Sequence, residues 1–215
     1  MINITKDNDI VFSKEDIINF NNITKHVGKG TFGFVRSLNE DTLVKAYREF
    51  FDFSNPIDLP NVLMDKKKFE EDIVSRYSYK IKKGDYIRMA KERLSKTKYA
   101  NDLILGCALY NDFAFGAVLN NYKGYRPLNS KINRLSVDNY IKLVTNIDKH
   151  LEDLFDNYIY PNDVKESNIL FNDNLDVKII DLDDEVTIYS DSLNKIAENN
   201  SVRNFKNCMY RVRRK

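Results

Sequence analysis

The sequence predicts an α+β protein, with an antiparallel sheet in its first half and helices in its second half. Residues 23–47 and 103–119 are rich in β-branched and aromatic residues and are interrupted by turn-forming residues, which indicates strands. Residues 136–158 instead carry apolar residues at spacings of three and four, which is typical of an amphipathic helix.

The composition favours one compact protein and excludes several classes. A chain of 215 residues with 42% hydrophobic residues can bury a sizeable core as one domain. The net charge of +2 gives no general argument for nucleic-acid binding, and no run approaches the ~20 apolar residues of a membrane span. Two cysteines, Cys107 and Cys208, are too few for a disulfide framework. They indicate a reducing compartment, so we expect a cytoplasmic location.

The first strands are predicted after a short helix near the N-terminus. Ser13 is a good N-cap residue, and Asp16 three positions later completes the pattern of a capping box. The apolar side chains that follow would give this helix one buried side. They are Ile17, Ile18 and Phe20.

A glycine-rich motif then covers Gly28, Gly30, Gly33 and Val35 in a G-x-G-x-x-G-x-V pattern. The pattern alone is a weak signal. The short apolar segment after it leads directly into a turn at 39–41, which leaves no room for the helix of a dinucleotide-binding fold. The segment around the glycine motif therefore fits best as a strand, a loop, a second strand, a turn and a third strand.

Lys45 falls on the third of these strands, within the β-rich segment 42–47. An ammonium group at this point could neutralise phosphate charge. The alternative is a solvated lysine on a sheet edge, which is the usual fate of lysine.

Residues 50–119 contain a loop region, two expected helices and a hairpin. Periodicity predicts helices at 64–79 and 85–98. The apolar runs 103–110 and 113–119 flank Asn111–Asp112, which indicates a β-hairpin. With the strands around the glycine motif, this hairpin would complete a five-stranded antiparallel sheet.

The clearest helix is expected at 136–158, with Ser136 as its cap. His150 falls off the apolar stripe and is expected to be exposed, whereas His26 is expected in a strand. The stripe that should form the core of the second half consists of Val137, Tyr140, Ile141, Val144, Ile147, Leu151, Leu154 and Tyr158.

Three polar residues stand out in the stretch 158–183. Asp163 and Asn168 precede a hairpin predicted from the runs 169–171 and 177–180, and Asp181 follows its second strand. The joining residues 172–174 favour a turn. This arrangement gathers two carboxylates and an amide at one edge, and such oxygen ligands suit Mg²⁺.

Taken together, these motifs resemble those of the eukaryotic-like Ser/Thr protein kinase family. Residues 159–170 resemble the catalytic loop, and 178–183 resemble the metal-binding triplet with its preceding strand. The glycine motif and Lys45 are similar to the glycine-rich loop and the lysine of the third strand. The resemblance implies a two-lobed kinase-like fold, with an N-lobe at about 1–120 and a reduced helical C-lobe at about 121–215.

The resemblance also implies a role for each residue, with ATP and Mg²⁺ as cofactors. Asp163 would orient and deprotonate the acceptor hydroxyl, and Lys165 would steady the transferred phosphoryl group. Asn168 and Asp181 would hold Mg²⁺. The nucleotide would be bound by Gly28, Gly30, Gly33, Val35, Lys45 and Glu70. Glu71 and Glu92 remain alternatives to Glu70 as the glutamate that holds Lys45.

Several residues depart from the family pattern. Pro161-Asn162-Asp163 replaces His-Arg-Asp, and Asp181-Leu182-Asp183 replaces Asp-Phe-Gly. The segment after Asp181 is short, and two short helices are expected there at 192–200 and 202–212. This reduced plan resembles minimal kinases that pathogenic bacteria deliver into host cells, or small viral kinases, which would place the protein in the host cytoplasm.

Three functions stay open at the level of sequence. The favoured one is a Ser/Thr protein kinase that acts on a protein substrate. The second is a binding module on a kinase scaffold, which holds ATP and acts through a partner protein. The basic tail at 211–215 is compatible with an acidic partner. The third is a small-molecule phosphotransferase, against which Lys165 and the glycine motif argue.

Overall fold

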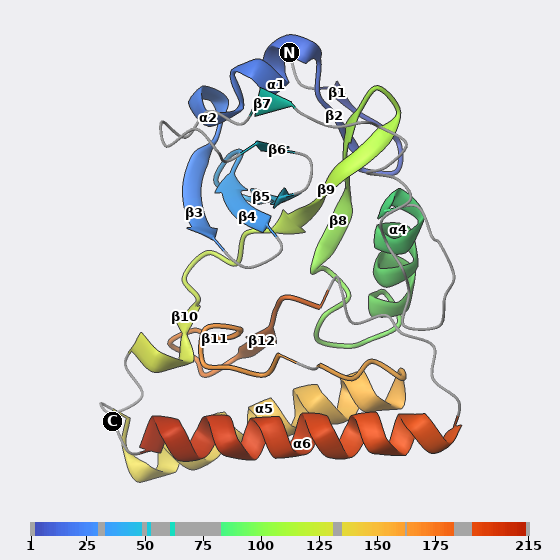
Figure 1. The fold of residues 1–215 in the computed structure, drawn as a ribbon. Coiled ribbons are helices and arrows are strands. Elements are labelled where there is room, and N and C mark those ends of the chain that lie inside the picture. Colours follow the sequence, from blue (N-terminus) through green and yellow to red (C-terminus); the bar gives the residue numbers. More distant parts are fainter. Residues whose placement is uncertain are drawn as a thin grey trace. The chain divides into compact units, whose positions relative to one another are not determined.

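A computed structural model describes residues 3–29, 33–48, 51–52, 61–62, 83–130, 135–161, 163–182 and 191–213 (Figure 1). The chain divides into two compact units. The first unit comprises residues 1–91 and 104–123, and the second comprises 92–103 and 124–215.

The first unit is built on a mostly antiparallel seven-stranded sheet, which confirms the predicted α+β class. The strand order is β1-β2-β8-β9-β5-β4-β3, and only the β2–β8 pair is parallel. The five long strands are the expected ones, and β1 and β2 extend the sheet by two short strands. The bounds are β1 (Asn3–Ile4), β2 (Ile10–Val11), β3 (Lys25–Lys29), β4 (Gly33–Ser37), β5 (Thr42–Tyr47), β8 (Ile104–Tyr110) and β9 (Phe113–Asn120). A separate pair is formed by β6 (Phe51–Asp52) and β7 (Asn61–Val62).

The expected turns join these strands. Asn111 and Asp112 connect β8 to β9 with φ angles of 49° and 65°, and a tight hairpin turn with two positive φ angles favours these residue types. Between β4 and β5, the Asn39 side chain accepts a hydrogen bond of 2.9 Å from the Asp41 backbone N–H. Both turns therefore follow from their sequences, and His26 lies in β3 as predicted.

Aromatic side chains form the core on one side of this sheet. The short helices α1 (Lys14–Ile18) and α2 (Phe20–Ile23) precede β3, and the capping box of Ser13 and Asp16 is present. The ring of Phe20 lies 6.1 Å from that of Phe34 and 6.0 Å from that of Phe115, and Phe12 lies 5.3 Å from Phe115. The N-terminal segment therefore packs against the sheet through aromatic contacts.

The second unit contains the long helix α5 (Val137–Asp156), which Ser136 caps as predicted. Its buried stripe differs from the expected one, since it consists of Leu143, Ile147, His150, Leu151 and Leu154. Val137, Ile141 and Tyr158 are exposed instead. The apolar residues of the sequence pattern span a wide face of α5. Other residues of the second unit cover only one side of that face, which explains the difference.

The prediction that His150 is exposed is wrong, because only 1% of its surface is accessible. Its ring lies 5.4 Å from the ring of Tyr99. Burial and the nearby Lys178 ammonium lower the pKa of His150 to about 3, so its ring is neutral at ordinary pH. Burying a neutral imidazole costs less free energy than burying a charged one. Hydrophobic periodicity counts histidine as polar and therefore does not predict its burial.

A small antiparallel sheet contacts α5 through its strand β12, and its strands come from segments before and after α5 in the sequence. Its order is β10 (Arg126–Pro127), β11 (Ile169–Phe171) and β12 (Val177–Ile179). The predicted hairpin β11–β12 is confirmed, and the Asn172 side chain holds its turn by accepting from the backbone N–H groups of Asn174 and Asp176. The 3₁₀ helix η2 (Leu128–Ser130) follows β10.

Two further helices complete the described elements. Helix α4 (Lys83–Leu94) overlaps the prediction for 85–98, while the prediction for 64–79 lies outside the described residues. The prediction of two short helices near the C-terminus is wrong, because α6 (Asp191–Arg213) is one continuous helix. At the expected break, the Ser201 hydroxyl oxygen lies 3.1 Å from the Ala197 carbonyl oxygen one turn earlier, a position that serine often takes inside helices. Both cysteines are free and buried, and no described helix is long and apolar enough to cross a membrane.

Candidate functional site

The second unit brings together the polar residues predicted from the stretch 158–183. Asn168 is buried, and its side-chain nitrogen lies 3.0 Å from the backbone carbonyl oxygen of Asp163. The same nitrogen lies 3.4 Å from a carboxylate oxygen of Asp163 and 3.3 Å from one of Asp181. One amide therefore joins the two carboxylates.

The hairpin β11–β12 explains why these groups meet. Ile169 pairs with Ile179, and the Ile180 N–H donates to the Asn168 carbonyl at 2.9 Å. This pairing holds the residue before β11 beside the residue after β12. Asp181 then leaves the strand with a φ of 66°, a left-handed conformation that is uncommon outside glycine and often occurs at functional sites.

Asp163 and Lys165 form an ion pair in the loop before the hairpin. Both side chains are about half exposed, so water screens the pair and its contribution to stability is small. The Asp163 carboxylate is therefore accessible to a hydroxyl group from outside the chain, and Lys165 places a positive charge next to it.

Helix α6 supports this loop through a residue that the sequence interpretation missed. The Ser201 hydroxyl is fully buried and donates to the Pro161 carbonyl at 2.9 Å. Pro161 lies two residues before Asp163. The signal that could have identified Ser201 is its position within the apolar stripe of the helix, between Ala197 and Phe205. A hydroxyl buried there requires a hydrogen-bond partner.

Asn168 and Asp181, the expected magnesium ligands, carry an amide oxygen and a carboxylate, and their role stays a prediction. Mg²⁺ is usually bound by one or two carboxylates together with waters and substrate phosphates. The Asn168 amide directs its nitrogen toward the Asp181 carboxylate at 3.3 Å, and its side-chain oxygen accepts from the Ser167 hydroxyl at 3.3 Å. Among the described residues, no group of three or more His, Cys, Asp or Glu side chains could hold a metal ion.

In the first unit, Lys45 lies on β5 and is only 7% exposed, which excludes a solvated edge lysine. Val35 of β4 lies opposite Lys45, and Gly28 of β3 lies opposite Val35. On the other side of β5, Ala117 of β9 pairs with Lys45. Because directly paired residues project from the same face of a sheet, Val35 and Lys45 share a face with the Gly28 position.

The glycines of the motif differ in what they require. A Cβ atom at Gly33 would lie 2.3 Å from the Ala46 carbonyl oxygen, so no side chain fits there. A Cβ atom at Gly28 would meet no atom within 4 Å, although the register of β3 shifts next to this residue. Gly30 lies outside the described residues.

The predicted glutamate partners of Lys45 are only partly described. Glu70 and Glu71 lie outside the described residues. Glu92 lies in the last turn of α4, is exposed, and pairs with Lys96 at 3.7 Å. Glu92 thus forms an exposed surface pair with a residue just beyond the end of α4.

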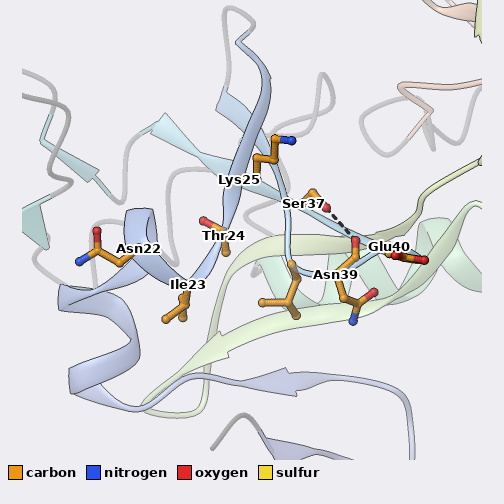
Figure 2. Close-up of a pocket in the computed structure, with 8 residues that line it drawn as sticks. Asn22, Ile23, Thr24, Lys25, Ser37, Asn39 and Glu40 are labelled. Carbon is orange, nitrogen blue, oxygen red and sulfur yellow. Dashed lines mark hydrogen bonds between the residues drawn. The ribbon is translucent and has the colours of Figure 1, made fainter.

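A shallow pocket of about 450 Å³ lies elsewhere in the first unit (Figure 2). It is bounded by the end of α2, the start of β3 and the turn after β4. The pocket contains none of the predicted site residues. Its lining consists of Asn22, Ile23, Thr24, Lys25, Ser37, Leu38, Asn39 and Glu40.

Comparison with known proteins adds no family assignment to this geometry. No protein-family model matches the chain, and no curated protein sequence matches it at a significant level.

Proposed function

We propose that the protein is an ATP-dependent Ser/Thr protein kinase, which transfers the γ-phosphoryl group of ATP to a protein hydroxyl. The contacts of the Asn168 amide with Asp163 and Asp181 are the observation that carries this proposal. The stretch 163–181 contributes two carboxylates and an amide to one cluster, a combination that kinases use for phosphoryl transfer. The five antiparallel strands β8-β9-β5-β4-β3, together with the helices of the second unit, also support a two-lobed kinase-like fold.

Each residue has a defined role in this proposal. The accessible carboxylate of Asp163 accepts the proton of the acceptor hydroxyl and orients it. Lys165, already paired with Asp163, neutralises charge on the transferred phosphoryl group. Asn168 and Asp181 would hold Mg²⁺, which supplies charge neutralisation at the phosphates when bound.

The first unit supplies the residues proposed to bind the nucleotide. Lys45 is buried on the sheet face that Val35 shares, on a strand next to the one that begins at Gly33 of the glycine motif. In the proposal, its ammonium contacts phosphate oxygens of bound ATP and is held in place by Glu70. The backbone of the glycine motif would lie over the phosphates, where side chains at Gly28, Gly30 and Gly33 would obstruct its approach.

The test is transfer of labelled phosphate from Mg·ATP to a generic protein substrate and to the protein itself. Asp163→Asn, Asp181→Asn and Lys45→Met should each lower transfer by at least about a hundredfold. Asp156→Asn changes an exposed carboxylate in the last turn of α5 and should leave transfer unchanged. Undiminished transfer by the Asp181→Asn variant would refute the assignment.

A second candidate is an ATP-binding module that acts through a partner protein. The ion pair between Lys165 and Asp163 favours it, because the candidate base is already engaged by a cation. Calorimetric titration with Mg·ATP separates the candidates. Nucleotide binding that is lost in Lys45→Met, without transfer by the unaltered chain, would support the module. Transfer that depends on Asp163 would support the kinase.

A further inference from the structure

The turn at residues 5–9, which leads from β1 to β2 in the first unit, is built around the carboxylate of Asp9. The Thr5 N–H donates to the Asp9 carbonyl at 2.8 Å, and the Asp9 N–H donates to the Thr5 hydroxyl at 3.1 Å. Asn8 adopts a left-handed φ of 64°, which asparagine tolerates well. Only 5% of Asp9 is exposed, and a carboxylate buried to this extent requires partners.

The two oxygens of this carboxylate join two different elements. Asp9 Oδ1 accepts from the backbone N–H of Cys107 on β8 at 2.7 Å, and Oδ2 lies 3.1 Å from the guanidinium of Arg88 on α4. A second contact comes from Lys91 of α4, whose ammonium donates to the Asp7 carbonyl at 2.9 Å. The turn therefore bridges a strand of the sheet and a helix, and we name residues 5–9 the latch.

The sheet accommodates the latch at Gly106 of β8. A Cβ atom at Gly106 would lie 2.5 Å from the Asn8 carbonyl oxygen and 2.8 Å from Asp9 Oδ1, so no side chain fits without displacing the latch. The register of β8 against β9 also shifts next to this glycine. The strand is therefore shaped to receive the latch.

Arg88 has two carboxylates nearby, and Asp9 provides the stronger contact. Asp85, one turn earlier on α4, lies 3.6 Å from the Arg88 guanidinium, and its side chain is 59% exposed. The Asp9 side chain lies closer and is only 8% exposed. Water screens an exposed ion pair more than a buried one, so the pair with Asp9 holds Arg88.

Helix α4 begins on the sheet face that carries Lys45. Cys107 and Lys45 both pair with Ala117 of β9, so their side chains project from the same face, two strands apart. On this face the Cys107 thiol donates to the Gly84 carbonyl at the start of α4, at 3.7 Å. The buried residues in the first turns of the helix are uncharged, namely Gly84, Ile87 and Ala90. Apolar contacts are non-directional, so the polar contacts with the latch fix the position of the helix.

We propose that Asp9 is a positioning residue for the nucleotide site, because through Arg88 it holds α4 on the sheet face that carries Lys45. The inference rests on the proposed function, in which Lys45 contacts the phosphates of ATP. A closed latch fixes the start of α4 on that face, and an open latch releases it. Mg·ATP then binds more weakly, because the apparent affinity of a ligand falls with the fraction of molecules in the binding-competent form.

Cys107 provides a local test of the latch that does not depend on catalysis. Its thiol is fully buried at the start of α4 and should react with iodoacetamide only when the latch opens. Cys208 on α6, in the second unit, is also free and buried, and it reports the opening of that unit. The labelling rates of both thiols in the full chain are measured by mass spectrometry of their peptides.

Three variants locate the effect. Asp9→Asn and Arg88→Gln should each raise the labelling rate of Cys107 at least about tenfold, because each removes a charged hydrogen bond that closes the latch. The rate of Cys208 should stay unchanged in both. Asp7→Asn is the matched control, because the Asp7 side chain is exposed and its contact with Lys91 uses the backbone carbonyl. It should label like the unaltered chain.

The two latch variants act in opposite directions on the thiol itself. Burial, and then the negative charge of Asp9, raise the pKa of the Cys107 thiol to about 12, whereas the positive charge of Arg88 lowers it. Because the thiolate is the reactive form, charge alone would make Cys107 react faster in Asp9→Asn and more slowly in Arg88→Gln. Faster labelling in both variants therefore requires release of the latch.

Calorimetric titration with Mg·ATP connects the latch to the nucleotide site. The Kd of Mg·ATP should rise about tenfold in Asp9→Asn and in Arg88→Gln, and should stay unchanged in Asp7→Asn. The coupling is reciprocal, so saturating Mg·ATP should slow the labelling of Cys107 in the unaltered chain. Lys45→Met should remove this protection.

Several results would overturn the proposal. Unchanged labelling of Cys107 in both latch variants, slower labelling in Arg88→Gln, or an equal rise for Cys107 and Cys208 would show that no local latch is released. Unchanged Mg·ATP affinity in variants that label faster would show that the latch does not position the nucleotide site, while the proposed function would stand. If the unaltered chain binds no Mg·ATP, the positioning role and the proposed nucleotide site are both wrong, and the labelling of Cys107 then tests the latch alone.

Discussion

The buried His150 should make the stability of the protein fall as the pH is lowered. Burial, and then the positive charge of Lys178, lower the pKa of its ring in the folded state from 6.5 to about 3. Above pH 6.5, neither the folded nor the unfolded chain protonates this ring. Between about pH 6.5 and pH 3, only the unfolded chain does, so its proton uptake favours unfolding.

The size of the effect follows from the two pKa values. Each full pH unit between them is worth about 1.4 kcal/mol, but the ring of the unfolded chain is already half protonated at pH 6.5. Lowering the pH from 6.5 to 4.5 should therefore remove about 2 kcal/mol of unfolding free energy through His150. For a chain of this length, that loss corresponds to a fall in Tm of about 4–8 °C. Replacing His150 by leucine keeps an apolar side chain against Tyr99 and removes the titrating group.

The assay is denaturant unfolding followed by circular dichroism at several pH values between 8 and about 4.5. Carboxylates also contribute to the acid slope, so the informative quantity is the difference between the unaltered chain and His150→Leu. That difference should change by about 3 kcal/mol across the whole range from pH 8 to about 4.5. The control variant His26→Gln removes the histidine on β3 and should keep the steep profile, because His150 is still present. Parallel profiles for the unaltered chain and His150→Leu would refute the reasoning.

Two further predictions concern the loop before β11 and the glycine motif. Ser201→Ala removes the buried donor to the Pro161 carbonyl and should cost about 1–2 kcal/mol of unfolding free energy, with a lower rate of any phosphate transfer. Ser95→Ala removes an exposed bond to the Glu92 carbonyl and should cost less than about 0.5 kcal/mol, so equal losses in the two variants would contradict the role of burial. Gly33→Ala forces a Cβ atom against the Ala46 carbonyl and should cost about 1–3 kcal/mol by thermal unfolding. Gly28→Ala should be close to neutral, and a larger cost there than at Gly33 would contradict the structure.

Local sequence signals predicted much of the fold because the forces behind them act over a few residues. The capping box at Ser13, the turn at Asn111–Asp112 and the hairpin after Asn168 each depend on hydrogen bonds or φ preferences within a short segment. The meeting of Asn168 with Asp181 followed from the hairpin between them. That part of the candidate site was therefore predictable without long-range contacts.

Burial was harder to predict, because it depends on which neighbours cover a given face. The apolar pattern of α5 includes Val137 and Ile141 as well as Ile147 and Leu151, and all four fit one wide stripe. Only the latter two are covered in the second unit, together with His150. Whether a polar ring can join them depends on Tyr99, a contact distant in sequence. Periodicity therefore identifies a helix but does not identify the residues that its neighbours bury.

The glycine motif shows the same separation between a pattern and its physical cause. Spacing treats its glycines alike, yet only at Gly33 does the neighbouring strand leave no room for a Cβ atom. The constraint comes from Ala46 on β5, which the turn at 39–41 brings alongside β4. Because Gly28 has free space, its absence of a side chain is not needed for packing among the described residues. A requirement for glycine at this position would have to come from a ligand. Calorimetric titration of the Gly28→Ala variant with Mg·ATP therefore distinguishes a binding role from a structural one. Weakened Mg·ATP binding with unchanged stability supports a binding role.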